Sequence, residues 1–129
     1  MRITTGSVVV VEGLPDPQAA NPKPRRCIVA RRVDDGTLWL VVAATTRFEA
    51  DNLQDDEVAL MFDRIPGRAR TTFDRPTVAK CSWLAVVRES DCRAVGAVGN
   101  ETLNTILQRV GLAVAAGTHS IARDDRHEG

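Results

Sequence analysis

Two neighbouring stretches decide the fold: Lys23-Pro-Arg25-Arg26-Cys-Ile-Val-Ala-Arg31-Arg32 and Leu38-Trp-Leu-Val-Val-Ala-Ala-Thr45-Thr46. Each contains an apolar run, from Cys27 to Ala30 in the first and from Leu38 to Ala44 in the second. An Asp-Gly step between two apolar runs is a strong hairpin signal, and Asp35-Gly36 supplies one here. The sequence therefore predicts two antiparallel strands at the centre of a sheet.

Basic and hydroxyl side chains meet at one end of this predicted hairpin. Arg25 and Arg26 begin the first strand, and Thr45 and Thr46 end the second, so the hairpin brings both pairs to the same end of the sheet. Guanidinium and hydroxyl groups side by side are suited to holding a phosphate. The alternative is that the arginines keep a strand end solvated and the threonines cap it.

Length and composition restrict the class of protein. The 129 residues suit one domain with its own core. Lys+Arg equals Asp+Glu at 17 each, so any nucleic-acid contact must be a local patch.

Three cysteines are an odd number without metal-site spacing, and Cys27 and Cys81 are expected to be buried thiols. We expect no metal and no cofactor. The absence of a leader and of a long apolar run predicts a cytoplasmic protein that does not enter a membrane.

Three further strands and two long loops are expected around the hairpin. The loops are the proline-rich segment Leu14–Pro24 and the acidic segment Phe48–Asp56. We predict that the first loop is mobile, because it has few large apolar residues to hold it in place. The strands are expected at Gly6–Val11, at Glu57–Phe62 and at Thr77–Val87, the last with a bend near Ser82.

One helix is predicted after these strands. Asn100 is a natural N-cap, and an apolar stripe of Leu103, Ile106, Leu107 and Val110 follows it. The helix then ends at Gly111 or continues to Ala116. The expected fold is mainly β with a C-terminal helix: a single domain over residues 1–116 that forms a small barrel or strongly bent sheet, followed by a flexible tail over residues 117–129.

In this order of segments, the chain resembles the PemK/MazF family of toxin ribonucleases from type II toxin–antitoxin systems. The resemblance runs from about Gly6 to about Leu112. Order and spacing carry it, because no single motif is specific. The segments concerned are the opening strand Gly6-Ser-Val-Val-Val-Val, Lys23-Pro-Arg25-Arg26, Val41-Val-Ala-Ala-Thr45-Thr46, Lys80-Cys81-Ser82 and the closing Val95-Gly-Ala-Val with its helix.

This resemblance implies an SH3-like barrel of the PemK/MazF/CcdB type, a homodimer, an antitoxin partner and metal-independent cleavage of single-stranded RNA through a 2′,3′-cyclic phosphate. By position, Arg25 is similar to the family's catalytic arginine and Thr45 to its partner hydroxyl. The residues then expected to bind RNA are Lys23, Arg26, Thr46, Arg68, Arg70, Lys80 and Ser82. The resemblance also implies that the Leu14–Pro24 loop borders the RNA groove. The Phe48–Asp56 loop is then expected to face away from it, because its acids would repel phosphates.

The chain also departs from the family pattern. Arg26 replaces a proline, and the loop before Arg25 lacks the family's frequent carboxylate. Lys80-Cys81-Ser82 replaces an Arg-Cys-Asp triplet, and neither Glu12 nor Asp16 matches a family position, so no proton acceptor is identified. Two alternatives follow: a toxin of the same fold that acts by binding a protein, as the gyrase-poisoning relatives do, or a catalytically silent SH3-like interaction module.

Overall fold

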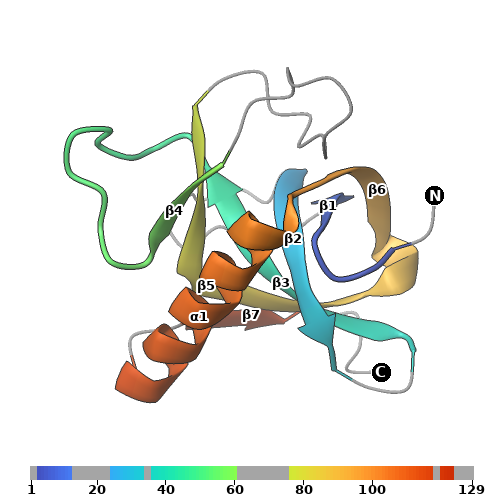
Figure 1. Cartoon of the computed structure of the whole chain (residues 1–129). Helices are drawn as coiled ribbons and strands as arrows, with labels where there is room; N and C mark the ends of the chain where they lie inside the picture. Colours follow the sequence, from blue (N-terminus) through green and yellow to red (C-terminus); the bar gives the residue numbers. More distant parts are fainter. Residues whose placement is uncertain (1–2, 13–23, 34–35, 61–75, 118–119, 124–129) are drawn as a thin grey trace.

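The computed structural model describes residues 3–12, 24–33, 36–60, 76–117 and 120–123, which form one sheet and one α-helix (Figure 1). Within these residues seven strands pair in the order β4-β5-β3-β2-β1-β6, and β7 pairs with β5. The prediction of a mainly β fold with a C-terminal helix is confirmed. The elements are β1 Ser7–Val11, β2 Arg25–Arg32, β3 Leu38–Thr45, β4 Glu57–Leu60, β5 Thr77–Arg88, the short 3-10 turn Glu89–Asp91, β6 Cys92–Ala97, α1 Asn100–Ala116 and β7 Ser120–Arg123.

The central hairpin is confirmed. β2 and β3 pair antiparallel, with Cys27 opposite Ala43 and Ile28 opposite Val42. The Val33 N–H donates to the Leu38 carbonyl at 3.0 Å and closes the turn. Gly36 has φ 145°, a backbone conformation that residues with a Cβ rarely adopt.

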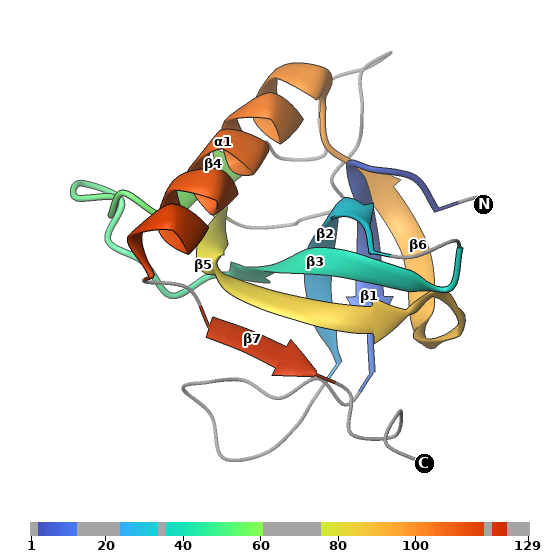
Figure 2. The ribbon, with the colours of Figure 1, turned by 90° about the horizontal axis from the view of Figure 1, so that it is seen from below.

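The sheet bends strongly at β5. Val42 of β3 lies opposite Leu84, but Ala44 lies opposite Ala79, so the pairing is irregular over the part of β5 that includes Ser82. The sequence predicted a bend at this point. Figure 2 shows β3 and β5 crossing the direction of β1 and β6. β4 and β6 end the hydrogen-bonded order, and closure into an SH3-like barrel stays a prediction.

Two buried clusters form the core, one on each face of the sheet. Ile28 and Ala30 of β2 face the first cluster, which includes Ile106 and Val110 of α1. Cys27 and Val29 alternate with them and join Trp39 in the second cluster. Each face of the central strands is therefore buried, which explains their continuous apolar runs.

α1 packs on β5, β4 and β2 (Figure 1). Its first residue is Asn100 and its N-cap is Gly99, so the predicted cap was one residue late. The helix continues through Gly111 to Ala116. It ends at Gly117, whose left-handed φ of 70° lets its N–H donate to the Ala113 and Val114 carbonyls.

Two short strands differ from the sequence prediction. Ser120–Arg123 was expected in a flexible tail, but it forms β7 and pairs parallel with β5, with Trp83 opposite Ser120. Cys92–Ala97, for which we predicted no strand, forms β6 and pairs with β1. Both segments are too short and too mixed in polarity to show a clear period of two, so pairing with β5 and with β1 determines their conformation.

The three thiols should react with an alkylating reagent in an order set by their burial. Burial raises the pKa of Cys27 and of Cys81 from the ordinary 9.0 to about 12, and that of the half-buried Cys92 to about 11. We expect iodoacetamide to modify Cys92 first in the folded protein, as peptide mass spectrometry would show. Modification of Cys27 or Cys81 before Cys92 would contradict the burial.

The same pKa values predict how stability changes with pH. In the unfolded chain the thiols lose protons near pH 9, whereas the folded protein holds them to about pH 12, so stability should fall as pH rises from 9 toward 12. The chain has no tyrosine to titrate in this range. Urea midpoints at pH 8 and pH 10 measure the fall, and a Cys27→Ala, Cys81→Ala double variant should show a smaller one.

Candidate nucleic-acid interface

Arg25 and Thr45 lie at the same end of the central hairpin, as predicted. Cys27 pairs with Ala43, and Arg25 and Thr45 each lie two residues farther toward the same end of the hairpin. Side chains two residues apart in a strand share a face, so both belong to the face of the second core cluster, with Cys27. Arg25 is half-buried and Thr45 is only 7% exposed. A cation and a hydroxyl therefore share one face at this end.

The Thr45 hydroxyl already has a structural role. Its Oγ1 accepts a hydrogen bond from the Arg47 N–H at 3.1 Å and so holds the turn after β3. This contact supports the capping alternative, but it uses only the acceptor side of the hydroxyl, and the O–H remains a donor. Thr46 beside it is exposed. Arg26 is also exposed and, by strand alternation, belongs to the opposite face from Arg25.

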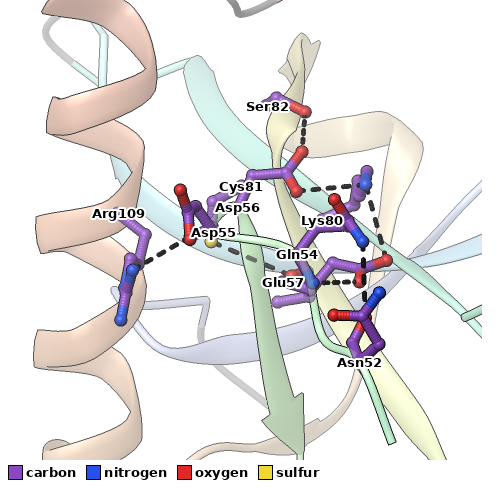
Figure 3. Close-up of polar contacts among 10 residues, drawn as sticks. Asn52, Gln54, Asp55, Asp56, Glu57, Lys80, Cys81, Ser82 and Arg109 are labelled. Carbon is purple, nitrogen blue, oxygen red and sulfur yellow. Dashed lines mark hydrogen bonds and ion pairs between the residues drawn. The ribbon is translucent and has the colours of Figure 1, made fainter. Parts of the chain in front are cut away.

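Lys80 and Ser82 gather around Asp56 (Figure 3). Lys80 Nζ lies 3.1 Å from Asp56 Oδ1 and 3.4 Å from Glu57 Oε2, and Ser82 Oγ donates to the other oxygen of Asp56. The Cys81 N–H donates to the Asp56 carbonyl, which fixes the end of the acidic segment against β5. Two carboxylates thus neutralise the Lys80 ammonium.

This cluster bears on two sequence predictions at once. Lys80 and Ser82 were expected to bind RNA, and the acidic segment that ends at Asp56 was expected to face away from RNA. The structure joins all three residues in one cluster, so the two expectations cannot both hold. The pairing of β4 with β5, which places Glu57 opposite Lys80, brings the acids to this position.

A cleft of about 550 Å³ opens beside the cluster, between the acidic segment and the C-terminal half of α1. The Arg109 guanidinium of α1 donates to the Asp55 carbonyl at 3.1 Å and links the two walls (Figure 3). Sequence reasoning missed this cleft, because its walls lie far apart in the chain. The cleft is lined by Gln54, Asp55, Asp56, Ser82, Arg109, Leu112, Ala113 and Ala116.

Glu12 is a described carboxylate near the register position of Arg25. It follows Val11, which lies directly opposite Arg25 in the β1–β2 pair, and it is exposed. Sequence reasoning set Glu12 aside because it matched no family position. The β1–β2 register, which a single sequence does not give, brings it to this end of the sheet.

Other predicted residues lie outside the part of the chain that the structure describes. They are Lys23, Arg68, Arg70 and nearly all of the Leu14–Pro24 loop. Within the described ranges, no three His, Cys, Asp or Glu side chains gather as a metal site would require. No described helix has the length and hydrophobicity needed to span a membrane.

Comparison with known proteins identifies the architecture. No protein-family model matches the sequence, and no curated protein matches it either. Among solved structures, the Mycobacterium tuberculosis toxin MazF-mt6 superposes with a TM-score of 0.57 and 17% sequence identity, over 83% of this chain and 96% of that chain. The chain has a MazF-like fold. The resemblance suggested by the sequence is thus confirmed for the fold, in a divergent form.

Asp56 is expected to stabilise this MazF-like fold through its side chain. Asp56→Ala leaves Lys80 with one carboxylate and Ser82 without its acceptor. Loss of one partner from such a network typically costs about 1–3 kcal/mol. Urea unfolding would measure the loss. The matched control is Asp51→Ala, an exposed acid of the same segment, which should change stability by about 0.5 kcal/mol or less. Equal effects of the two variants would contradict a structural role for Asp56.

Proposed function

We propose that this protein is a MazF-like toxin that cleaves single-stranded RNA where Arg25 and Thr45 meet. One observation carries the proposal: a half-buried guanidinium and a hydroxyl share one face at one end of the central hairpin, within a MazF-like fold. An arginine stays charged at any working pH and matches the geometry of a phosphate. The site is therefore suited to stabilising a phosphodiester whose transition state carries more negative charge than its ground state.

The proposed reaction needs no group from outside the RNA and the protein. The ribose 2′-oxygen attacks the adjacent phosphorus, the bond from phosphorus to the 5′-oxygen breaks, and the products are a 2′,3′-cyclic phosphate and a free 5′-hydroxyl. One proton leaves the 2′-oxygen and one reaches the 5′-oxygen. In this scheme Arg25 stabilises the charge that develops on the phosphate oxygens, and the Thr45 O–H donates to one of them.

Glu12 is a described carboxylate at this end of the sheet, but we do not assign it as the proton acceptor. Val11 lies opposite Arg25 and shares its face, so the next residue, Glu12, belongs by alternation to the other face, with Arg26. We therefore expect Glu12→Gln to cleave RNA at nearly the rate of the unchanged protein. A large loss of rate in a folded Glu12→Gln variant would assign the proton acceptor to Glu12.

The proposed RNA path starts at the exposed Arg26 and Thr46, which flank the Arg25 and Thr45 end. Lys80 contributes to it only if Asp56 and Glu57 release its ammonium, because those carboxylates cancel the attraction that a phosphate would feel. Lys23, Arg68 and Arg70 remain proposed RNA-binding residues on sequence grounds. We also propose a cytoplasmic homodimer that is inhibited by an antitoxin protein, and light scattering would test the dimer.

Inducible expression in bacteria tests the proposed function. We expect growth arrest together with broken cellular RNA, and neither effect from Arg25→Ala. The matched control is Arg31→Ala, an exposed arginine at the other end of β2, which should behave like the unchanged protein. Growth arrest with intact RNA would replace the nuclease with a protein-binding toxin. Normal growth with intact RNA would leave a silent interaction module.

A further inference from the structure

The cleft between α1 and the acidic segment has one apolar wall, whose largest side chain, Leu112, does not belong to the core. Leu112 is 58% exposed, whereas the buried stripe of the helix consists of Ile106, Val110 and Ala113. Ala113 and Ala116, which have small side chains, line the cleft together with Leu112. A large exposed apolar side chain beside a concave surface is typical of a contact site.

The opposite wall is acidic. From Arg47 to Glu57, both included, the chain carries five carboxylates. Among the described residues, the cations on or in contact with this segment are Arg47, Lys80 and Arg109. Lys80 pairs with two of the acids, Asp56 and Glu57. The other three acids are exposed, and of these only Asp55 lines the cleft, so the charge that favours a cationic partner is centred on Asp55. These exposed acids are Glu49, Asp51 and Asp55.

Hydrogen bonds hold both walls in place. Arg109 donates to the Asp55 carbonyl, and Ser82 donates to Asp56 (Figure 3). The acidic segment is also tied to the start of β4, because the Gln54 N–H donates to Glu57 Oε1 at 2.8 Å. A cleft with fixed walls binds more tightly than one that must be ordered first, because less conformational entropy is lost.

We propose that this cleft docks a short segment of a partner protein that carries a leucine-sized apolar side chain next to lysine or arginine. The apolar side chain packs on Leu112, Ala113 and Ala116, and the cation lies against Asp55. RNA does not fit this surface, since its phosphates would face exposed carboxylates. The proposal is independent of RNA cleavage at Arg25.

A second copy of this chain fits the cleft less well than a cationic segment. A two-fold contact centred on Leu112 would place the acidic segment of one copy against that of the other. Like charges brought together in this way oppose association. The charge of the wall therefore selects a basic partner over self-association.

The probe for this proposal is a fluorescein-labelled synthetic peptide of alternating lysine and leucine. We expect saturable binding in fluorescence polarisation, weaker at high salt, with amide chemical-shift changes that centre on the cleft residues Asp55, Leu112 and Ala116. Two control peptides should bind at least about tenfold more weakly, one with glutamate in place of lysine and one with serine in place of leucine. Absent binding, or shift changes centred elsewhere, would overturn the proposal.

Matched variants distinguish specific binding in the cleft from nonspecific binding to the protein surface. Leu112→Ser should weaken peptide binding about tenfold, whereas Leu107→Ser, at an α1 leucine that is 38% exposed and does not line the cleft, should not. Asp55→Asn should weaken binding and Asp51→Asn should not. Asp55→Asn keeps the backbone carbonyl that holds Arg109. Equal effects within either pair would overturn the proposal, and so would a Leu112→Ser variant that turns a dimer into a monomer.

Discussion

Arg25→Ala is expected to abolish RNA cleavage and leave the protein folded. Arg25 begins β2, is only half-buried and belongs to neither core cluster, so its loss should cost little stability. In the proposed reaction its guanidinium stabilises charge that develops only in the transition state. Removal of one such preorganised donor typically lowers the rate by about 10²–10³.

Two further variants sharpen this test. Arg25→Lys keeps the charge but loses the planar fork that matches a phosphate, so we expect a rate between those of the unchanged protein and Arg25→Ala. Arg31→Ala removes an exposed arginine from the same strand and should cleave normally. Initial rates on a labelled single-stranded RNA, together with urea midpoints, give both readouts. A folded Arg25→Ala protein that cleaves at the normal rate would show that Arg25 has no catalytic role.

Ile106→Ala is expected to be the most destabilising of the substitutions considered. Ile106 is fully buried in the cluster that joins α1 to the sheet, and its neighbours there include Ile28 and Cys81. Truncation of a buried isoleucine leaves a cavity as well as losing transfer free energy, at a typical cost of about 2–5 kcal/mol. Urea unfolding followed by far-ultraviolet circular dichroism would measure the loss.

The control is the next residue of the same helix. Leu107 is 38% exposed, so Leu107→Ala removes an aliphatic side chain of the same size from a position that water still reaches. We expect a loss of about 1 kcal/mol or less. Equal losses at residues 106 and 107 would show that α1 does not pack as described.

The longest elements could be predicted because local signals and burial agree there. Leu38–Thr45 is an apolar run after a turn glycine, and its two faces meet the two core clusters. α1 shows its buried stripe in the sequence, with Ile106 and Val110 four residues apart. In such segments the residues that the hydrophobic period marks as buried are the ones that the structure buries.

Other parts depend on contacts that a single sequence does not reveal. Ser120–Arg123 becomes β7 only because an edge of β5 is available to pair with it. Gly99 rather than Asn100 caps α1, and no side-chain hydrogen bond forms at that cap. Element boundaries of this kind are set by the connection to β6, which the sequence did not predict.

The candidate site divides in the same way. Arg25 and Thr45 could be brought together from the hairpin signal alone, since the register of two strands joined by a short turn is restricted. The cluster of Asp56, Lys80 and Ser82 could not, because it needs both the β4–β5 pairing and the irregularity within β5. The cleft beside it needs, in addition, the docking of α1.

The most direct test of the proposed function is the chemistry of the RNA ends. Purified protein is incubated with single-stranded RNA in the presence of EDTA, and the new ends are identified by labelling and mass spectrometry. Our account predicts 5′-hydroxyl ends and 2′,3′-cyclic phosphates, which disappear with Arg25→Ala and remain with Arg31→Ala. New 5′-phosphate ends would contradict it. So would RNA that stays intact with a protein whose expression arrests growth.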